Sequence, residues 1–144
     1  MFESLFGTKN SRLAKKWTKE HEKMVVYAHK ILAAYSINDN EAIRKNLLDL
    51  RIVAINHIMT EDIEFYKLLQ DKKRLNESIE QSVHQFTDSF HDTKVVIRDF
   101  LRKYTEESAV YDENFFTTFN GIVDALGARI EYEEKNLYKL LRDK

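Results

Sequence analysis

Apolar residues recur along most of the chain at steps of three and four positions, the spacing that places side chains on one face of an α-helix. One such row comprises Leu50, Ala54, His57, Glu61, Phe65 and Leu68. A second row has the same steps and comprises Ile122, Leu126, Arg129, Glu133, Leu137 and Leu140. Both rows predict amphipathic helices whose core-facing stripe is interrupted at its middle by ionisable residues.

The apolar pattern predicts four helices, over residues 11–35, 40–70, 77–104 and 112–142. The segment SINDN precedes the second helix, with Asn38 and Glu41 in capping-box spacing, and Asn76 is placed to cap the third. The chain has no proline and only three glycines, so the helices should be uninterrupted. Because short connections make neighbouring helices antiparallel, we expect an all-α, up-down-up-down antiparallel four-helix bundle.

The second and fourth predicted helices share a repeated segment. HIMTEDIEFYKLL at residues 57–69 returns as RIEYEEKNLYKLL at residues 129–141, shifted by 72 positions (129 − 57), with six of thirteen residues identical. A weaker match joins the first and third helices, where HEKMVV at residues 21–26 resembles HDTKVV at residues 91–96. The two matches together predict a bundle built from two copies of a helical hairpin.

Length and composition narrow the class of protein. With 144 residues the chain is expected to form one domain over residues 1–144, of which 1–10 are a lead-in segment. The formal net charge is −1, with 23 basic and 24 acidic residues intermixed, so we expect no electrostatic capture of nucleic acid or of an anionic membrane. The absence of cysteine excludes disulfides and thiolate chemistry, and fits the cytoplasm. The start, MFESLFGTKN, has neither a basic region nor a long apolar run, so it is not expected to be a signal peptide.

The ionisable residues within or beside the apolar rows are the candidate functional residues. They are His21 of the first helix, His57 and Glu61 of the second, His91 of the third, and Arg129 and Glu133 of the fourth. A carboxylate that points into an apolar interior is costly unless it is paired or bound to a metal. Imidazole and carboxylate ligands together suit iron or a similar transition metal better than magnesium or calcium. The candidates therefore predict a metal site inside the bundle.

Short motifs stand at matching places in the predicted helices. The first helix carries KEHEKM, the second HIMTED followed by FY, the third a histidine, and the fourth RIEYEEKNLY. Over nearly its whole length the chain resembles the hemerythrin-like (HHE cation-binding) domains, whose pattern is a histidine in the first and third helices and His-x-x-x-Glu in the second and fourth. It departs from them at Arg129, where the family has histidine, and at Lys67 and Lys139, where the family usually has proline.

The resemblance implies a non-haem di-iron centre that serves oxygen binding, oxygen or redox sensing, or iron handling, with dioxygen or another small molecule as its ligand. Carried over to this chain, it assigns His21 and His57 to one iron, Glu61 and Glu133 to bridging positions, and His91 to the second iron. Arg129 cannot replace the missing ligand, because guanidinium stays protonated and has no acceptor atom. The resemblance therefore leaves a di-iron site or a reduced iron site.

A metal-free interaction protein is the alternative. In that case Arg129 pairs with Glu61 or Glu133 in place of the metal, and the bundle acts on a protein partner. The chain is similar in one short feature to the regulators of sigma D, which bind a sigma factor: Ala128 and Arg129 precede an acidic pair that begins at Glu133. The retained core histidines favour the metal hypothesis. No nucleophile with an adjacent base and no cofactor fingerprint is visible, so an enzyme is not expected.

Overall fold

The computed structural model describes residues 9–71 and 76–139, and within these ranges it is all-α, with four long helices and no strand. The elements are α2 (Lys9–Ser36), α3 (Asn40–Gln70), α4 (Glu77–Tyr104), α5 (Glu113–Tyr132) and the π-helix η1 (Glu133–Leu137). This confirms the all-α prediction. Most of the predicted lead-in and the end of the fourth predicted helix, residues 1–8 and 140–142, lie outside the described ranges.

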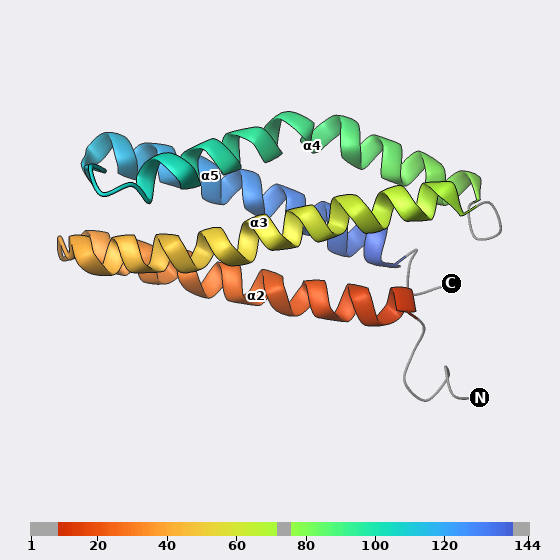
Figure 1. The fold of residues 1–144 in the computed structure, drawn as a ribbon, viewed down its shortest axis with the longest axis horizontal. Helices are drawn as coiled ribbons and strands as arrows, with labels where there is room; N and C mark the ends of the chain where they lie inside the picture. Colours follow the sequence, from red (N-terminus) through yellow and green to blue (C-terminus); the bar gives the residue numbers. More distant parts are fainter. Residues whose placement is uncertain (1–8, 72–75, 140–144) are drawn as a thin grey trace.

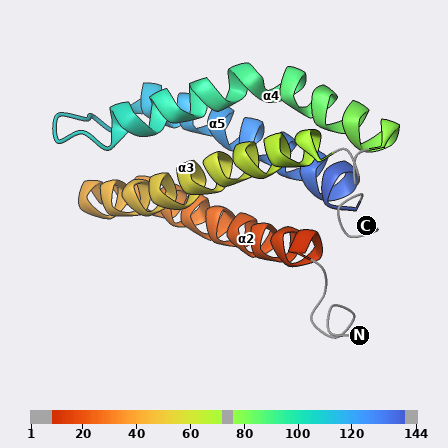
Figure 2. The same ribbon diagram turned by 45° about the vertical axis from the view of Figure 1, so that its right-hand side comes forward.

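Successive helices lie side by side, and the chain turns back at each connection between them (Figure 1). Contacts join α2 to α3, α3 to α4, and α4 to α5, while α2 also contacts α5. The view in Figure 2 shows the same grouping of the four helices from another side. These contacts are compatible with the predicted up-down-up-down order. In the described part of the chain, no helix has both the length and the apolar character needed to cross a membrane.

Side-chain caps fix where the helices begin. The side chain of Asp39 accepts a hydrogen bond of 3.1 Å from the backbone N–H of Ala42, so the cap of α3 lies one residue after the predicted Asn38. Asn38 instead has a positive φ of 58°, the left-handed conformation that asparagine tolerates better than most residues and that closes the turn. Asn76, as predicted, and Asp112 cap α4 and α5 in the same way.

The apolar interior consists of two clusters with a polar layer between them. The cluster at the end of the bundle that holds the turn between α2 and α3 includes Met24, Ala54 and Leu126. The cluster at the other end includes Trp17, Phe65, Phe86, Leu137 and Tyr138. The buried polar residues near the junction of the two clusters come from α2, α3, α5 and η1: His21, His57, Glu61, Arg129 and Glu133. The ionisable side chains therefore occupy one level of the core, enclosed by apolar packing above and below.

The fourth predicted helix is interrupted at this level. α5 ends at Tyr132 and the π-helix η1 follows, closed by a backbone hydrogen bond from the N–H of Tyr138 to the carbonyl of Glu133. In an α-helix, residues five apart lie about 140° apart around the axis. The wider turn of η1 brings such residues nearly above one another. Tyr138 is therefore 0% exposed, whereas its repeat partner Tyr66, on the regular helix α3, is 65% exposed.

Candidate metal centre

Five of the predicted residues meet at the polar level of the core. Their exposed fractions are 2% for His21 and His57, 0% for Glu61 and Glu133, and 3% for Arg129. His21 comes from α2, His57 and Glu61 from α3, and Arg129 and Glu133 from α5 and η1. The two histidines and two glutamates form a group that could hold a metal ion, since one ligand atom from each lies within 4.8 Å of all the others.

The two histidines present their Nε2 atoms to the centre of this group. The Nε2 atoms of His21 and His57 are 3.0 Å apart. Nε2 of His21 lies 3.1 Å from Oε1 of Glu133, and Nε2 of His57 lies 3.1 Å from Oε1 of Glu61. An ion about 2.0–2.2 Å from each nitrogen and oxygen ligand separates those ligands by about 3–4 Å. The separations of 3.0 and 3.1 Å at the two imidazoles lie in this range, so the histidines and the carboxylates that face them could share a first-row metal ion.

Two outer carboxylates hold the far sides of the imidazole rings. Nδ1 of His57 lies 2.8 Å from Oε1 of Glu20, and Nδ1 of His21 lies 2.7 Å from Oε2 of Glu134. An ionised carboxylate can only accept a hydrogen bond, so each Nδ1 must carry the proton and donate it. In a neutral imidazole the other nitrogen then has a lone pair. Both Nε2 atoms are therefore set up as acceptors that point at the centre.

The centre of the group is consequently short of positive charge. When both histidines are neutral, the lone pairs of their Nε2 atoms face each other across 3.0 Å, beside two buried carboxylates. Both carboxylate oxygens of Glu133 lack a hydrogen-bond donor. Unpaired buried acceptors of this kind are costly. A cation bound between the side chains, or added protons, removes that cost.

Arg129 supplies part of the missing positive charge to the two glutamates. Its Nη2 lies 3.4 Å from Oε1 of Glu61, and its Nε lies 3.7 Å from Oε2 of Glu133. The guanidinium also stacks over the ring of Phe86, with 4.7 Å between Cζ and the ring centre. In the repeat, Arg129 occupies the position that corresponds to His57, and it faces the same glutamates. With neutral histidines and both carboxylates ionised, one guanidinium still leaves one negative charge uncompensated.

Tyr138 completes the polar level, and the sequence pattern did not identify it. Its hydroxyl donates a very short hydrogen bond to Oε2 of Glu61, and its ring stacks on His21 with 5.6 Å between ring centres. Nothing in the apolar periodicity marks this residue, because a regular helix would turn it away from Glu133. The π-helix at Glu133 is what brings it into the core.

The neighbouring charges shift the pKa values of the cluster in the metal-free state. Burial alone would lower the pKa of His57, but Glu133 and Glu61 outweigh it and raise this pKa to about 10. Burial, followed by the charge of Glu133, raises the pKa of Glu61 to about 8. Burial opposes ionisation of Glu133, yet Glu61 and the two imidazoles hold its pKa well below the usual range. Without metal and at neutral pH, Glu61 is therefore protonated and uncharged, and the charge of Glu133 is compensated by the protonated His57 and by Arg129.

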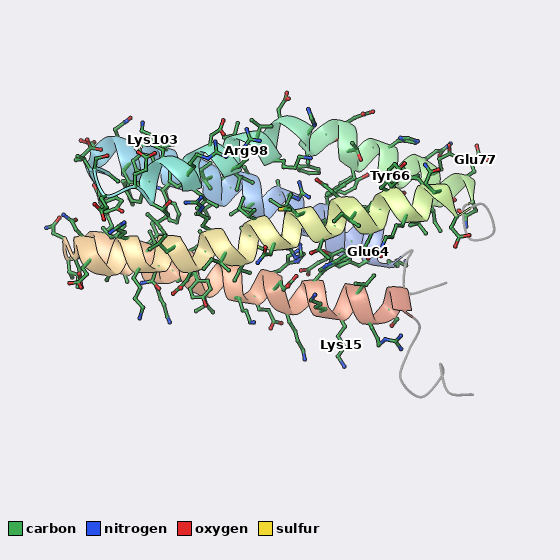
Figure 3. All side chains as sticks on the ribbon, viewed as in Figure 1. Lys15, Glu64, Tyr66, Glu77, Arg98 and Lys103 are labelled. Carbon is green, nitrogen blue, oxygen red and sulfur yellow. The ribbon has the colours of Figure 1, made fainter. Side chains whose placement is uncertain are left out.

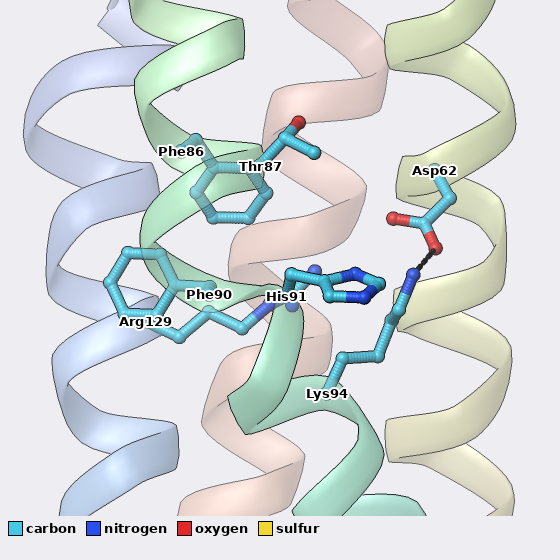
Figure 4. Close-up of a pocket in the computed structure, with 7 residues that line it drawn as sticks. All are labelled: Asp62, Phe86, Thr87, Phe90, His91, Lys94 and Arg129. Carbon is cyan, nitrogen blue, oxygen red and sulfur yellow. Dashed lines mark hydrogen bonds and ion pairs between the residues drawn. The ribbon is translucent and has the colours of Figure 1, made fainter.

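His91, the remaining predicted ligand, does not join the buried group. It is exposed on α4, because it follows Phe90 and so lies about 100° around the helix from the core-facing row. Figure 4 shows it in front of the Arg129 guanidinium, at a small pocket whose opposite wall is the 2.9 Å ion pair between Lys94 and Asp62. The pocket has room for about one water molecule. The predicted role of His91 as a ligand stays a prediction.

Residue spacing did not identify the outer glutamates either. Glu20 and Glu134 adjoin the candidate residues His21 and Glu133 in the chain, which is the one signal that could have pointed to them. Charged residues beside a core row are usually solvated, so adjacency alone does not identify such a role.

Comparison with family models, with curated proteins and with solved structures finds no match to this chain.

Proposed function

We propose that this chain is a hemerythrin-like metal-binding protein whose bundle, built from two repeated hairpins, holds one iron ion. His21, His57, Glu61 and Glu133 are its ligands, and Arg129 takes the place of a second ion. The function is oxygen or redox sensing, or iron handling, with dioxygen or another small molecule as the ligand of the iron.

One observation carries this proposal: the fixed orientation of the two imidazoles. Glu20 and Glu134 hold Nδ1–H of His57 and His21, so both Nε2 lone pairs converge at 3.0 Å. Metal-binding histidines characteristically donate their other ring N–H to a carboxylate, which fixes the tautomer and raises the basicity of the ligand. Two such pairs around a single centre are an arrangement that binding of a cation explains. Packing of an apolar core does not require these carboxylate–imidazole pairs.

The charges around the glutamates support one ion and not two. The guanidinium of Arg129 is 3% exposed and lies within 3.4 and 3.7 Å of the carboxylates of Glu61 and Glu133. A fixed positive charge there repels a second dication. His91, which would serve that second ion, is exposed. We therefore expect a stoichiometry of one metal per chain.

The donor set supports iron or a neighbouring first-row metal. Two neutral imidazoles with two carboxylates suit Fe, Mn, Co or Zn better than calcium or magnesium, because the latter two prefer oxygen ligands alone. A bound iron supplies a redox couple and a Lewis-acidic position for a small ligand. The protein residues hold the imidazoles in one tautomer, exclude water with apolar packing on both sides, and keep a proton on the Tyr138 hydroxyl beside Glu61.

A metal-free interaction protein is the second candidate. The observation that favours it is the charge balance without metal: Arg129 lies beside the ionised Glu133, and the raised pKa of His57, about 10, keeps that imidazole protonated at neutral pH. Protons and a guanidinium then fill the role of the ion. In that case the bundle would act on a protein partner, as the regulators of sigma D act on a sigma factor.

Metal analysis of untagged protein tests the proposal. We expect about one iron per chain after anaerobic loading with ferrous iron, and loss of binding in His57→Ala and Glu61→Ala. His29→Ala is the matched control, since His29 is exposed and lies outside the group. His91→Ala should leave the stoichiometry at one.

Two further results would change the conclusion. Parent protein that stays free of iron, manganese, cobalt and zinc after loading would contradict metal binding and favour the interaction protein. Two ions per chain in the parent, reduced to one in His91→Ala, would instead show a di-iron site despite Arg129.

A further inference from the structure

α3 carries a second apolar row on the side away from the core. Ile52, Met59 and Ile63 each lie two positions after a residue of the core row, which places them about 200° around the helix. With their neighbours at steps of three and four they form the α3 outer stripe: Leu48, Ile52, Ile55, Met59, Ile63 and Tyr66. Ile55 is partly buried, and the other five are 38–65% exposed. A helix that is apolar on two opposite faces is expected to be covered on both.

The stripe is long enough for a helix–helix interface. From Leu48 to Tyr66 it extends about 27 Å along the helix, at 1.5 Å per residue. Tyr66 projects on the side of α3 nearer α4, and Glu64 on the side nearer α2 (Figure 3). A groove lined in part by Ile58, Met59 and Val95 extends the apolar surface towards α4. A standard interface buries about 800 Å² per partner, a little over half of it apolar, so the stripe would supply the apolar part and its polar flanks the rest.

The order of residues along the stripe is nearly symmetric about position 57. Leu48 and Tyr66 are equally far from this position, and so, within one residue, are Ile52 and Ile63. Ile55 and Met59 flank it directly. When two identical helices pack antiparallel about a two-fold axis at this point, each apolar side chain therefore meets another apolar side chain. Self-complementarity of this kind is what a two-fold interface requires of one surface.

The charges beside the stripe have the same symmetry. Asp49 and Lys67 lie on the same edge of it, about 80° around the helix from its centre, and their positions are nearly equidistant from the proposed axis. In an antiparallel two-fold pair, residues on the same edge face each other. Each Asp49 would then lie opposite Lys67 of the second copy, so the pair occurs twice. Lys67 also has a 3.7 Å intrachain ion pair with Glu64, on an exposed surface where such a pair contributes little.

We infer that the α3 outer stripe is the interface between two copies of this chain, packed antiparallel about a two-fold axis near residue 57. Its apolar side chains pack across the axis, and Asp49 and Lys67 fix the antiparallel register. The stripe lies opposite the buried metal ligands on α3, so the association does not depend on the metal. Failure of metal binding would therefore not contradict the dimer, and absence of the dimer would not contradict metal binding.

Sedimentation equilibrium of the full chain over a range of concentrations tests the interface. We expect a reversible dimer for the parent protein and a monomer for Met59→Glu, because this change places a charge against the apolar Ile55 of the other copy. Val26→Glu is the matched control: Val26 is 49% exposed and lies on α2, in a shallow groove lined by α2 residues alone. It should leave the dimer unchanged. Far-UV circular dichroism establishes that each variant is folded.

Charge exchange tests the antiparallel register. Asp49→Lys and Lys67→Glu each replace two attractions with two repulsions, and each should raise the dimer dissociation constant by about ten-fold. The double variant restores opposite charges and should return close to the parent value. A parent that remains monomeric at every concentration overturns the inference. A dimer that Met59→Glu does not weaken, or single variants that the double variant does not rescue, overturns it equally.

Discussion

Replacing Arg129 with histidine tests the central electrostatic argument, since it changes the charge balance and the ligand set together. In the metal-free protein the change removes the partner of a buried carboxylate: Nε of Arg129 lies 3.7 Å from Oε2 of Glu133, and these residues are 3% and 0% exposed. Breaking such a pair costs about 3–5 kcal/mol. For a domain of this size each kcal/mol lowers Tm by a few degrees, so Tm should fall by about 10 °C.

Ferrous iron should reverse much of that loss in Arg129→His. The new imidazole stands four residues before Glu133, which recreates the second His-x-x-x-Glu, and the fixed charge that repels a second ion is gone. A ligand at about one hundred times its dissociation constant stabilises the folded state by about 2.7 kcal/mol. We therefore expect Tm to recover most of its fall in iron, and the bound iron to exceed one ion per chain.

The assay is a thermal melt under anaerobic conditions, with and without ferrous iron, combined with metal analysis. Arg98→His is the matched control, because Arg98 is exposed on α4 and pairs only with its neighbour Asp99 among the contacts described for it. Its free energy of unfolding should change by no more than about 0.5 kcal/mol. If Arg129→His melts at the parent temperature in both conditions and binds no additional iron, Arg129 neither stabilises the glutamates nor limits metal binding, and the reasoning is refuted.

Two further predictions concern the metal-free protein and are measured by urea unfolding. Tyr138→Phe leaves an oxygen of Glu61 without its hydrogen-bond donor, so it should lower the free energy of unfolding by about 1–3 kcal/mol. Tyr66→Phe, at the exposed position of the repeat, is the control and should change this free energy by less than about 0.5 kcal/mol. Equal effects of the two changes would contradict the difference between the two copies of the repeat. The pKa values of His57 and Glu61 are raised to about 10 and about 8, so their stabilising contributions are complete below about 6.5 and 4.5, their ordinary values, and are lost as pH rises through the folded values. The free energy of unfolding should therefore decline between pH 6.5 and 10, whereas iron affinity should increase with pH because His57 must release its proton to bind; stability that rises over this range would contradict the charge balance of the core.

Helix number, most helix ends and the core row were determined by the sequence alone. Steps of three and four apolar residues specify a helical face regardless of what packs on it, so α3 and α4 have the predicted bounds of residues 40–70 and 77–104. The same rows predicted that His57, Glu61 and Glu133 are buried, because an ionisable residue in the middle of an apolar stripe is buried together with its neighbours. Local chemistry of this kind needs no knowledge of the partner helix.

The detailed site was decided by tertiary structure. Tyr138 enters the core only because the chain forms a π-helix at Glu133, a choice that depends on packing and has no signature in the spacing of residues. Glu20 and Glu134 became partners of the histidines because rotamers and helix rotation bring residues 37 and 113 positions apart in the chain to 2.8 and 2.7 Å. His91 shows the converse: its place beside the row of α4, and not on it, left it exposed although its residue type suits a ligand. Periodicity determines which face of a helix a residue occupies, and the packing of the helices determines which atoms meet there.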